Sequence, residues 1–310
     1  MKQLSSVLLL LSLLPGDLLA QPSEQSSKAE RLFYRAFYLD QAEARSKEAL
    51  ELYRQFLREA PGHRHAGAAA RYALNALKRS KRGKEAEAFA KQYASLLEES
   101  ARPGINASFL DPKLDVQRFL NRFESESREI YRLRKELAMR VGLAPGLRVA
   151  DIGAGTGLFS VPFAKAIGSQ GIVYAVEISP RFVEHLGKLA RATKLPQIRP
   201  LLCTERSAEL PANSIDLAFI CDTYHHFEFP AETMASIHKA LKPGGQLVVI
   251  DFIRIEGKSR KWILGHVRAG EKVFSSEIES AGFRLLARED VGLEENYFLR
   301  FVKRPASSRR

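Results

Sequence analysis

Apolar residues between positions 28 and 100 recur at the spacing of one face of a helix, and no alternating strand pattern interrupts them. Three stripes share this spacing: Ala49, Leu50, Tyr53, Phe56, Leu57 and Ala60; Ala69, Tyr72, Ala73, Ala76 and Leu77; and Ala86, Phe89, Ala90, Tyr93, Leu96 and Leu97. Pro61-Gly62 follows the first stripe and Gly83 precedes the third, and both signals end helices. The pattern predicts an α-helical region over residues 28–100.

Two segments of this helical region are loosely similar to each other. Residues 48–53 and 85–90 both begin with Glu and carry Ala and an aromatic residue at related positions, and their separation is close to the period of a tetratricopeptide repeat. The region therefore resembles a tetratricopeptide-like helix array. Two repeats are too few for a free solenoid. A helical cap packed on the rest of the chain and a protein-binding module both remain open.

The periodicity changes after Arg102-Pro103-Gly104, which has the composition of a linker. Residues 111–141 again have helical spacing, and the apolar side is formed by Phe119, Phe123, Ile130, Leu133 and Leu137. From residue 147 onward, short apolar runs alternate with helical stretches. This alternation is typical of an α/β fold with a parallel sheet.

A glycine-rich turn follows the first of these apolar runs, residues 147–152, and precedes a helical stretch that starts at Leu158. The turn and the residues before it read Asp151-Ile152-Gly153-Ala154-Gly155-Thr156-Gly157. Glycines allow the backbone to approach a ligand closely, and a helix N-terminus directs free N–H groups toward it. We therefore expect Gly153, Ala154, Gly155 and Gly157 to bind a cofactor, with the carboxylate of Asp151 beside a cationic part of it.

The spacing of the glycines separates two classes of nucleotide site. A dinucleotide fingerprint needs Gly-x-Gly-x-x-Gly, but Leu158 occupies the sixth position here. The pattern Asp-x-Gly-x-Gly-x-Gly instead resembles motif I of the class I S-adenosylmethionine (SAM) methyltransferases. A second apolar run, residues 171–176, ends at Glu177, about 20 residues past the turn. An acidic residue there can accept hydrogen bonds from both hydroxyls of a ribose.

The resemblance extends over roughly residues 123–304 and is greatest to the small-molecule branch that includes ubiquinone and menaquinone methyltransferases. It implies SAM as the cofactor and a Rossmann-like, seven-stranded, mostly parallel sheet with helices on both faces. The remaining strands are then expected at residues 201–204, 214–221 and 241–251, with a closing antiparallel pair at 282–285 and 297–301. The resemblance places Glu205 or Arg206 where the family often contacts the adenine, although the usual Gly-Asp pair is missing here. The helix before the first strand, with its aromatic stripe, is either core or a lid over the site.

The segment after the fourth expected strand carries the candidate chemistry. Ligands in open α/β sheets bind beyond the carboxyl ends of the strands, so residues 222–230 should face the transferred methyl group. His225 or His226 is the expected general base. Tyr224 could orient the nucleophile, and Asp222 could orient a histidine or bind the methionine amine. Because a base is on hand, an oxygen or an acidic carbon is the favoured methyl acceptor. The segment lacks the Asn/Asp-Pro-Pro-Tyr pattern of base-modifying enzymes, which disfavours nucleobase substrates.

The composition argues against some partners and some kinds of site. The formal net charge is +12, but the basic residues are scattered, so we expect no specific nucleic-acid partner. The two cysteines, Cys203 and Cys221, are too few for a disulfide framework, and no Cys/His spacing resembles a zinc site, so no metal is expected. Both cysteines lie in apolar runs and are expected to be buried thiols.

The N-terminus has the layout of a secretory signal peptide. Lys2 precedes the apolar run of residues 7–14, and Pro15-Gly16 breaks that run before a possible cleavage site after Ala20. This predicts export to the periplasm or the extracellular space, with no transmembrane span in the mature chain. An uncleaved N-terminal membrane anchor is the alternative. Export would remove the chain from the cytoplasm, where SAM is made.

These features predict three segments: a signal peptide at 1–20, a helical, tetratricopeptide-like region at 28–100 and a SAM-dependent methyltransferase domain at 110–305. The expected activity is methyl transfer to a small molecule, with a possible protein partner on the N-terminal helices. The alternative is a catalytically weak SAM-binding protein that acts as a scaffold through its helical region. A nicotinamide-dependent reductase is a third hypothesis, and Leu158 counts against it.

Overall fold

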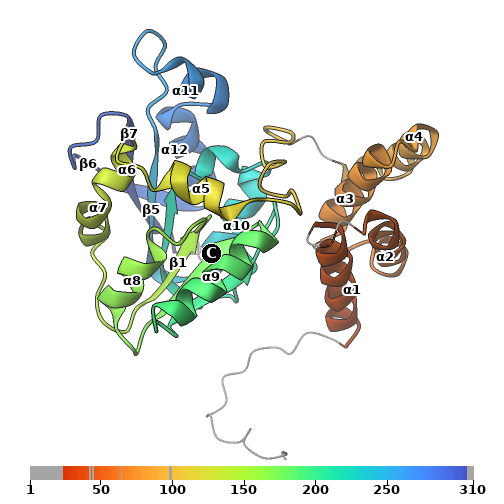
Figure 1. The fold of residues 1–310 in the computed structure, drawn as a ribbon, viewed down its shortest axis with the longest axis horizontal. Coiled ribbons are helices and arrows are strands. Elements are labelled where there is room, and N and C mark those ends of the chain that lie inside the picture. The colour runs from red at the N-terminus through yellow and green to blue at the C-terminus, as the bar shows by residue number, and fades with distance from the viewer. Residues whose placement is uncertain (1–23, 42, 44, 64, 98–99, 306–310) are drawn as a thin grey trace, which may run out of the picture.

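The structure, a computed structural model, describes residues 24–41, 43, 45–63, 65–97 and 100–305. Two lobes are visible, an all-helical one and an α/β one (Figure 1). The predicted signal peptide lies outside the described residues. Among the described helices, none combines the length and the apolar character that crossing a membrane requires.

The helical lobe consists of helices that each pack against the next one along the chain. They are α1 (Glu24–Gln41), α2 (Ser46–Glu59), α3 (Ala66–Arg79), α4 (Gly83–Gln92) and the short 3-10 helix η1 (Ala94–Leu96). The first two predicted stripes are buried there except for the half-buried Ala60, and Ala86 and Phe89 of the third are buried as well. Helix α2 ends at Glu59 because the residue before a proline, Ala60, avoids helical dihedrals. The prediction of helix in this region is confirmed.

The stretch expected to be one helix over residues 111–141 is broken into pieces, so that prediction was wrong. It forms α5 (Val116–Phe123), α6 (Glu129–Arg132) and α7 (Arg134–Arg140). The Asp115 side chain caps α5 by accepting from the Gln117 N–H at 2.9 Å. Ser125 and Ser127 lie between α5 and α6, and Arg128, the residue before α6, has an extended backbone. The apolar stripe divides accordingly: Ile130 and Leu137 are core, whereas no residue of α5 is fully buried.

A seven-stranded sheet forms the centre of the α/β lobe, as the resemblance implied. The strands are β1 (Arg148–Ile152), β2 (Ile172–Glu177), β3 (Ile198–Leu202), β4 (Ile215–Cys221), β5 (Leu241–Phe252), β6 (Phe283–Glu289) and β7 (Asn296–Lys303). Their order is β3-β2-β1-β4-β5-β7-β6, and β7 is antiparallel to both of its neighbours. The third strand begins three residues before the expected residue 201, so Cys203 and Thr204 follow it. The order reverses between β1 and β4, where α/β sheets bind ligands.

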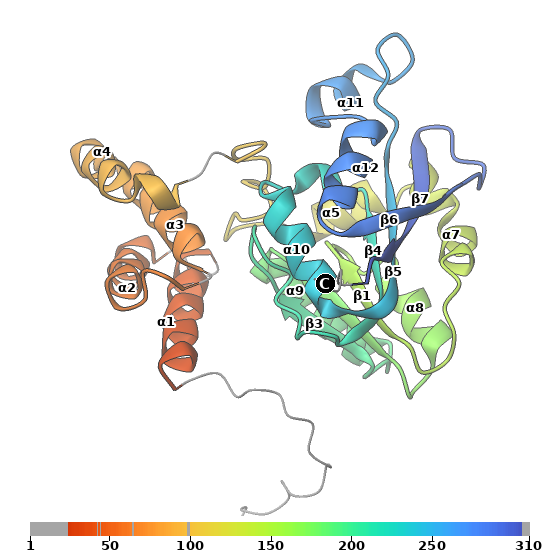
Figure 2. The same cartoon turned by 180° about the vertical axis from the view of Figure 1, so that it is seen from behind.

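Helices cover both faces of this sheet because successive strand residues point to opposite sides. On one face, α7 packs with α8 (Ser160–Ile167) and α9 (Pro180–Ala192), and Val149 of β1 contacts this layer. On the other face, seen in Figure 2, lie α10 (Pro230–Ala240) and α12 (Glu271–Ser280), and Ala150 of β1 contacts that layer. The 3-10 helix η2 (Tyr224–His226) follows β4, and α11 (Lys261–His266) lies between β5 and α12.

The two lobes meet beside the end of β3. The guanidinium carbons of Arg71, from α3, and Arg206 lie 3.6 and 3.8 Å from the centre of the Phe229 ring. Leu202, the last residue of β3, packs against the hydrophobic core of the helical lobe. The helical lobe is therefore in contact with the segments that follow β3 and β4, which are the segments that border the expected site.

Candidate functional site

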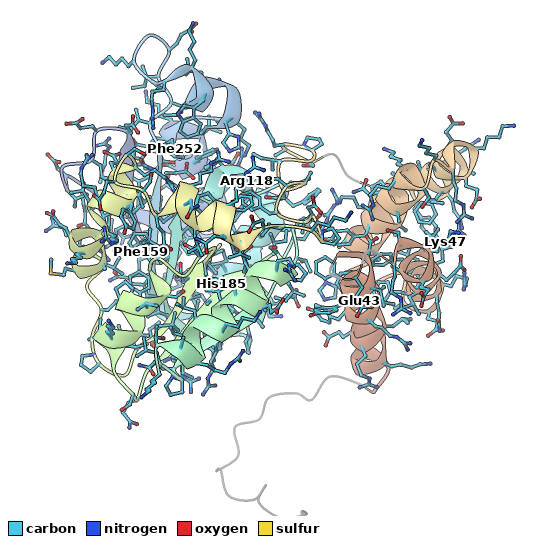
Figure 3. All side chains as sticks on the ribbon, in the orientation of Figure 1. Glu43, Lys47, Arg118, Phe159, His185 and Phe252 are labelled. Carbon is cyan, nitrogen blue, oxygen red and sulfur yellow. The ribbon has the colours of Figure 1, made fainter. Side chains whose placement is uncertain are left out.

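A cavity of about 540 Å³ opens at the carboxyl ends of β1, β2 and β4. Its size is within the usual range for small-molecule sites. The predicted residues that line it are Asp151, Gly153, Ala154, Gly155, Glu177, Glu205, Asp222, His225 and His226. Figure 3 shows α5, which carries Arg118, lying next to α9, which carries His185. Phe123 at the end of α5 and Phe182 of α9 also line the cavity, so α5 covers it as a lid would.

The glycines of the turn are needed for packing within the protein as well as for the close approach of a ligand. Gly153 has a φ of +73°, and a Cβ there would lie 2.3 Å from a side-chain carbon of Thr223. Gly157 faces the interior, where a Cβ would lie 2.5 Å from a methyl carbon of Leu189. Only at Gly155 would a Cβ meet nothing closer than 3.9 Å, at the Phe123 ring and the Gly153 carbonyl. The turn thus needs two of its glycines for packing, and the cavity wall is formed at Gly153, Ala154 and Gly155.

Glu177 connects the glycine turn to the end of β2. Its Oε2 accepts from the Gly155 N–H at 2.9 Å, and its Oε1 accepts from the N–H groups of Ile178 and Ser179 at 2.9 and 3.0 Å. Burial raises the pKa of this carboxyl above its usual value, although the three N–H groups oppose the shift. A carboxylate has about four acceptor positions, so further acceptor capacity remains, chiefly on Oε2, for a bound hydroxyl.

Asp151 is the second buried carboxyl in this part of the cavity. Its Oδ2 accepts from the Ser160 hydroxyl at 2.6 Å. Burial, assisted by the charge of Glu177, raises the pKa of Asp151 to about 7. A cationic ligand group would offset this cost by favouring the ionised form. Two adjacent carboxyls with raised pKa values fit a cofactor that carries both a cationic end and a ribose.

Glu205 lies where the cavity approaches the helical lobe. It is 7% exposed, and burial followed by the charge of Glu228 raises its pKa to about 7. The Tyr72 hydroxyl and the guanidinium of Arg71, both from α3, lower the pKa of Glu205 and so partly oppose this shift. Glu205, which is expected to contact the adenine, is thus also affected by side chains of the helical lobe.

Asp222 lines the cavity, as the sequence suggested, but its hydrogen-bond partners are not the expected ones. Its backbone is left-handed, with a φ of +48°, and its carboxylate pairs with Arg128 and accepts from the Asn296 amide at 2.6 Å. Burial raises the pKa of this carboxyl. Its hydrogen bonds go to Arg128 and Asn296, and a different aspartate binds the histidine. The expectation that Asp222 orients a histidine was therefore wrong.

Tyr224, unlike Asp222, does not line the cavity, which corrects its proposed role at the reacting group. Its ring is fully buried in the hydrophobic layer on the α10 side of the sheet, 4.9 Å from the ring of Phe274. Its hydroxyl donates to Glu277 at 3.0 Å. Because η2 turns tightly, Tyr224 points into the core while the two residues after it face the cavity.

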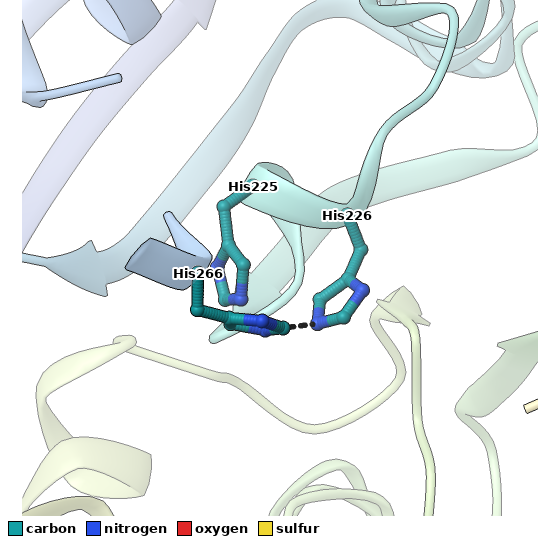
Figure 4. Close-up of side chains that lie close together, drawn as sticks. All are labelled: His225, His226 and His266. Carbon is teal, nitrogen blue, oxygen red and sulfur yellow. Dashed lines mark hydrogen bonds between the residues drawn. The ribbon is translucent and has the colours of Figure 1, made fainter. Parts of the chain in front are cut away.

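Three imidazoles meet at the other end of the cavity (Figure 4). Nδ1 of His225 is 2.8 Å from Oδ1 of Asp251, and both side chains are almost completely buried. Nε2 of His226 is 3.3 Å from Nε2 of His266. Burial, followed by the neighbouring histidines, lowers the pKa of His226 to about 2, and burial lowers that of His266 to about 4.

The sequence-based prediction missed two members of this group. Asp251 was expected to be the last residue of the fifth strand but was given no role in the site; it lies near the carboxyl end of β5, beside the end of β4. That position was a usable signal, because adjacent parallel strands end at one edge of the sheet. His266 is 40 residues from His226, in α11, and nothing in its local sequence marks it. Cys203 and Cys221, expected to be buried thiols, are half-buried and line the cavity.

The walls beside the histidines are aromatic. The ring of Phe109 is 5.3 Å from that of His226, and Phe252 is 5.6 Å from His225. Trp262 of α11 packs edge-on against Phe252 at 5.0 Å and is 42% exposed, so it borders the cavity at the molecular surface. Asn106 donates to the carbonyl of His226 at 3.0 Å and fixes η2 from the linker side. This end is suited to a flat, largely apolar molecule.

Comparison with known proteins agrees with the predicted fold and with a methyltransferase domain. A family model described as "Methyltransferase domain" matches residues 150–249. The chain is 28% identical over 116 residues to the ubiquinone/menaquinone biosynthesis C-methyltransferase UbiE of Burkholderia orbicola, covering 37% of this chain and 47% of that protein. It is 29% identical over 154 residues to UbiE of Bordetella avium, covering 48% and 58%. The chain spans about half the length of these curated relatives.

Solved structures share the fold at low identity. A SAM-dependent methyltransferase from Aquifex aeolicus matches with a TM-score of 0.53 and 23% identity, covering 61% of this chain and 99% of that one. The [4+2]-cyclase SpnF matches with a TM-score of 0.50 and 20% identity, covering 56% and 81%. Since one of these proteins is named for a different reaction, the fold alone does not fix the chemistry.

Residues 150–249 match a methyltransferase domain, and the α/β fold is shared with a solved SAM-dependent methyltransferase. This match and this fold imply SAM as the cofactor. The cavity fits this cofactor on its own chemistry: Asp151 and Glu177 are buried acceptors beside a backbone turn, at the edge where the strand order reverses.

Proposed function

We propose that this protein transfers a methyl group from SAM to a small molecule, at an oxygen or an acidic carbon. The observation that carries the proposal is the position of His225 and His226, which line the same cavity as Asp151 and Glu177 but at its other end. When bound, SAM supplies a methyl group on a positively charged sulfur. The protein's own residues then need to hold the cofactor, align the acceptor and exclude water.

The acceptor class follows from the walls around the histidines. Phe109, Phe252 and Trp262 offer flat apolar surfaces at this end, and the imidazoles are the polar groups between them. Such a site favours a planar, conjugated molecule with one reactive polar atom. The names of the UbiE relatives, which refer to C-methyl transfer in quinone biosynthesis, support an acceptor of this kind.

Methyl transfer to a hydroxyl or an acidic carbon releases a proton, so the polar groups at this end should matter for turnover. The assignment of His225 or His226 as the general base stays a prediction. Of the two, His226 is the poorer base, because burial holds its pKa at about 2. His225 has the better support, since Asp251 binds its Nδ1 and leaves Nε2 toward the cavity.

The test uses purified full-length protein, SAM and a panel of phenols, enols and quinols, with SAM binding measured separately by calorimetry. We expect the double variant His225→Asn/His226→Asn to lose about 10²–10⁴-fold in turnover, while its SAM affinity stays near that of the wild type. The matched control is His238→Asn, in α10 outside the cavity. Wild-type turnover in the double variant would overturn the role of the two histidines as the base. Normal SAM binding with no turnover on any acceptor, in the wild type or the variants, would overturn the methyl-transfer proposal and favour the scaffold alternative.

Export remains a proposal from the sequence of residues 1–20. N-terminal sequencing of the protein from its native host, after cell fractionation, tests it. We expect a mature chain that begins near Gln21 in the exported fraction. An intact Met1 in the cytoplasmic fraction would contradict export.

A further inference from the structure

We infer that His225, His226 and His266 form a binding site for one divalent transition-metal ion, and that this ion holds the reacting oxygen of the methyl acceptor. One nitrogen of each imidazole lies within 4.8 Å of the others (Figure 4). Two of the histidines come from η2 and the third is the last residue of α11. The second half of this inference rests on the proposed function, whereas the ion site itself does not.

The separations fit ligands of a single ion. Imidazole nitrogens bind zinc at about 2.0–2.1 Å, and in tetrahedral geometry two such nitrogens are about 3.3 Å apart. Nε2 of His226 and Nε2 of His266 are separated by 3.3 Å. The nitrogen of His225 is farther away, and rotation of its neighbours' rings about their side-chain bonds can close that gap. Three protein ligands leave the fourth position open, as in catalytic rather than structural zinc sites.

The surroundings of His225 supply a second, independent observation. Histidines that bind metals usually donate their other ring nitrogen to a carboxylate or a carbonyl, which fixes the ring. Oδ1 of Asp251 lies 2.8 Å from Nδ1 of His225, and Asp251 is itself held by the N–H groups of His225 and Phe252 at 3.1 and 2.7 Å. The carboxylate therefore directs Nε2 of His225 toward the other two imidazoles.

Charged side chains of both signs act on the three histidines. Arg102 and Arg122 are close enough to affect these histidines and oppose a positive ion. The buried carboxylate of Asp251 offsets them from the side of β5.

The open position faces the cavity that Trp262 and Phe252 border. With the ion bound, Nε2 of His225 would be a ligand and not a general base, and the ion would take over the activation of the acceptor. An ionisable oxygen, such as that of a phenol or an enol, would bind at the open position and lose its proton to solvent more readily because of the ion's charge. The acceptor then forms a bond to the methyl carbon, either through that oxygen or through the conjugated carbon, as the bond from this carbon to sulfur breaks. The sulfur leaves as a neutral thioether, and the ion keeps its oxidation state throughout.

The experiment measures metal binding in untagged full-length protein, with no acceptor present. After treatment with a chelator and dialysis against Zn²⁺ or Co²⁺, we expect one ion per chain by elemental analysis and a Co²⁺ spectrum typical of nitrogen ligands. His266→Asn and His226→Asn should each weaken binding about 100-fold or more, whereas His238→Asn should not. Unchanged SAM affinity in each variant serves as the check on folding.

Two results would overturn the site: no stoichiometric ion in the wild type, or full binding in the triple variant His225→Asn/His226→Asn/His266→Asn. Turnover is then compared with and without the ion. Loss of turnover on chelation that returns with Zn²⁺ or Co²⁺ supports the role in holding the acceptor. Turnover that survives complete removal of metal rejects that role and leaves the methyltransferase proposal standing, while metal binding without any turnover rejects the proposed function alone.

Discussion

Oδ1 of Asp251, near the end of β5, lies 2.8 Å from Nδ1 of His225, which follows β4. This contact joins the carboxyl ends of two neighbouring strands and decides which nitrogen of His225 faces the cavity. Because Asp251 also accepts from two backbone N–H groups, it is fixed in place before any ligand arrives.

The first prediction concerns this aspartate. Asp251→Asn keeps the shape of the side chain but removes its charge and lets the amide donate, which turns the His225 ring or changes its tautomer. We expect metal affinity and turnover to fall by about 10–100-fold, the usual cost of losing such a partner. Titration with Zn²⁺ and steady-state kinetics measure the two effects. Asp216→Asn, on the solvent side of β4, is the control.

The second prediction is a pH dependence of SAM affinity. In the ligand-free protein the pKa of Asp151 is raised from 3.8 to about 7, so the carboxyl is mostly protonated at pH 6 and mostly ionised at pH 8. The cationic end of SAM favours the ionised form, and binding at pH 6 must therefore release a proton. Affinity should rise about tenfold from pH 6 to pH 8. Calorimetry in buffers of different ionisation enthalpy detects the released proton directly.

Asp151→Asn is the control for this effect and should remove most of it. The same raised pKa has the opposite consequence for folding, since ionising a buried carboxyl costs free energy in the folded state. The free energy of unfolding of ligand-free wild type, relative to Asp151→Asn, should fall as pH rises from about 4 to about 7. A pH-independent difference between the two proteins would contradict the burial argument.

The third prediction separates the two roles of Glu177. Glu177→Ala should weaken SAM binding by about 1.5–3 kcal/mol, the scale of hydrogen bonds to a charged group. It should also lower the melting temperature, because Gly155, Ile178 and Ser179 lose an acceptor. Calorimetry and thermal unfolding are the measurements, with Glu184→Ala on the exposed face of α9 for comparison. Unchanged SAM affinity together with a lower melting temperature would leave Glu177 a structural role only.

The fourth prediction follows from the burial of Tyr224. Tyr224→Phe removes the hydroxyl that donates to Glu277 but leaves the ring packed against Phe274. We expect a loss of about 1 kcal/mol in stability and no change in SAM affinity, KM or turnover. Denaturant unfolding and steady-state kinetics test this. A selective loss of turnover would return Tyr224 to the reacting site.

Features that follow from neighbouring residues in the sequence could be predicted, whereas features that depend on residues far apart in the sequence could not. The glycine turn, Glu177 and the positions of the strands along the chain were predictable because each follows from a local pattern or a regular alternation. The division of residues 111–141 into α5, α6 and α7 was not, because the apolar spacing continues across the break. Tyr224 was misplaced because a single 3-10 turn decides which side chains face the cavity, whereas Asp222 does line the cavity but pairs with Arg128, a residue far away in the sequence. His266 was beyond reach, since its partners are brought to it only by the crossing from β5 to α11.

The half-exposed Trp262 and the ligand candidate His266 both belong to α11, whereas Glu205 at the opposite end of the cavity is next to the helical lobe. Ile263 and Val267 anchor the α11 segment in the core. Exchange of the remaining residues between β5 and α12 would therefore alter which molecules enter while the nucleotide end is unchanged. For protein engineering, residues 253–266 other than Ile263 and His266 are a segment whose exchange should change acceptor choice separately from cofactor binding.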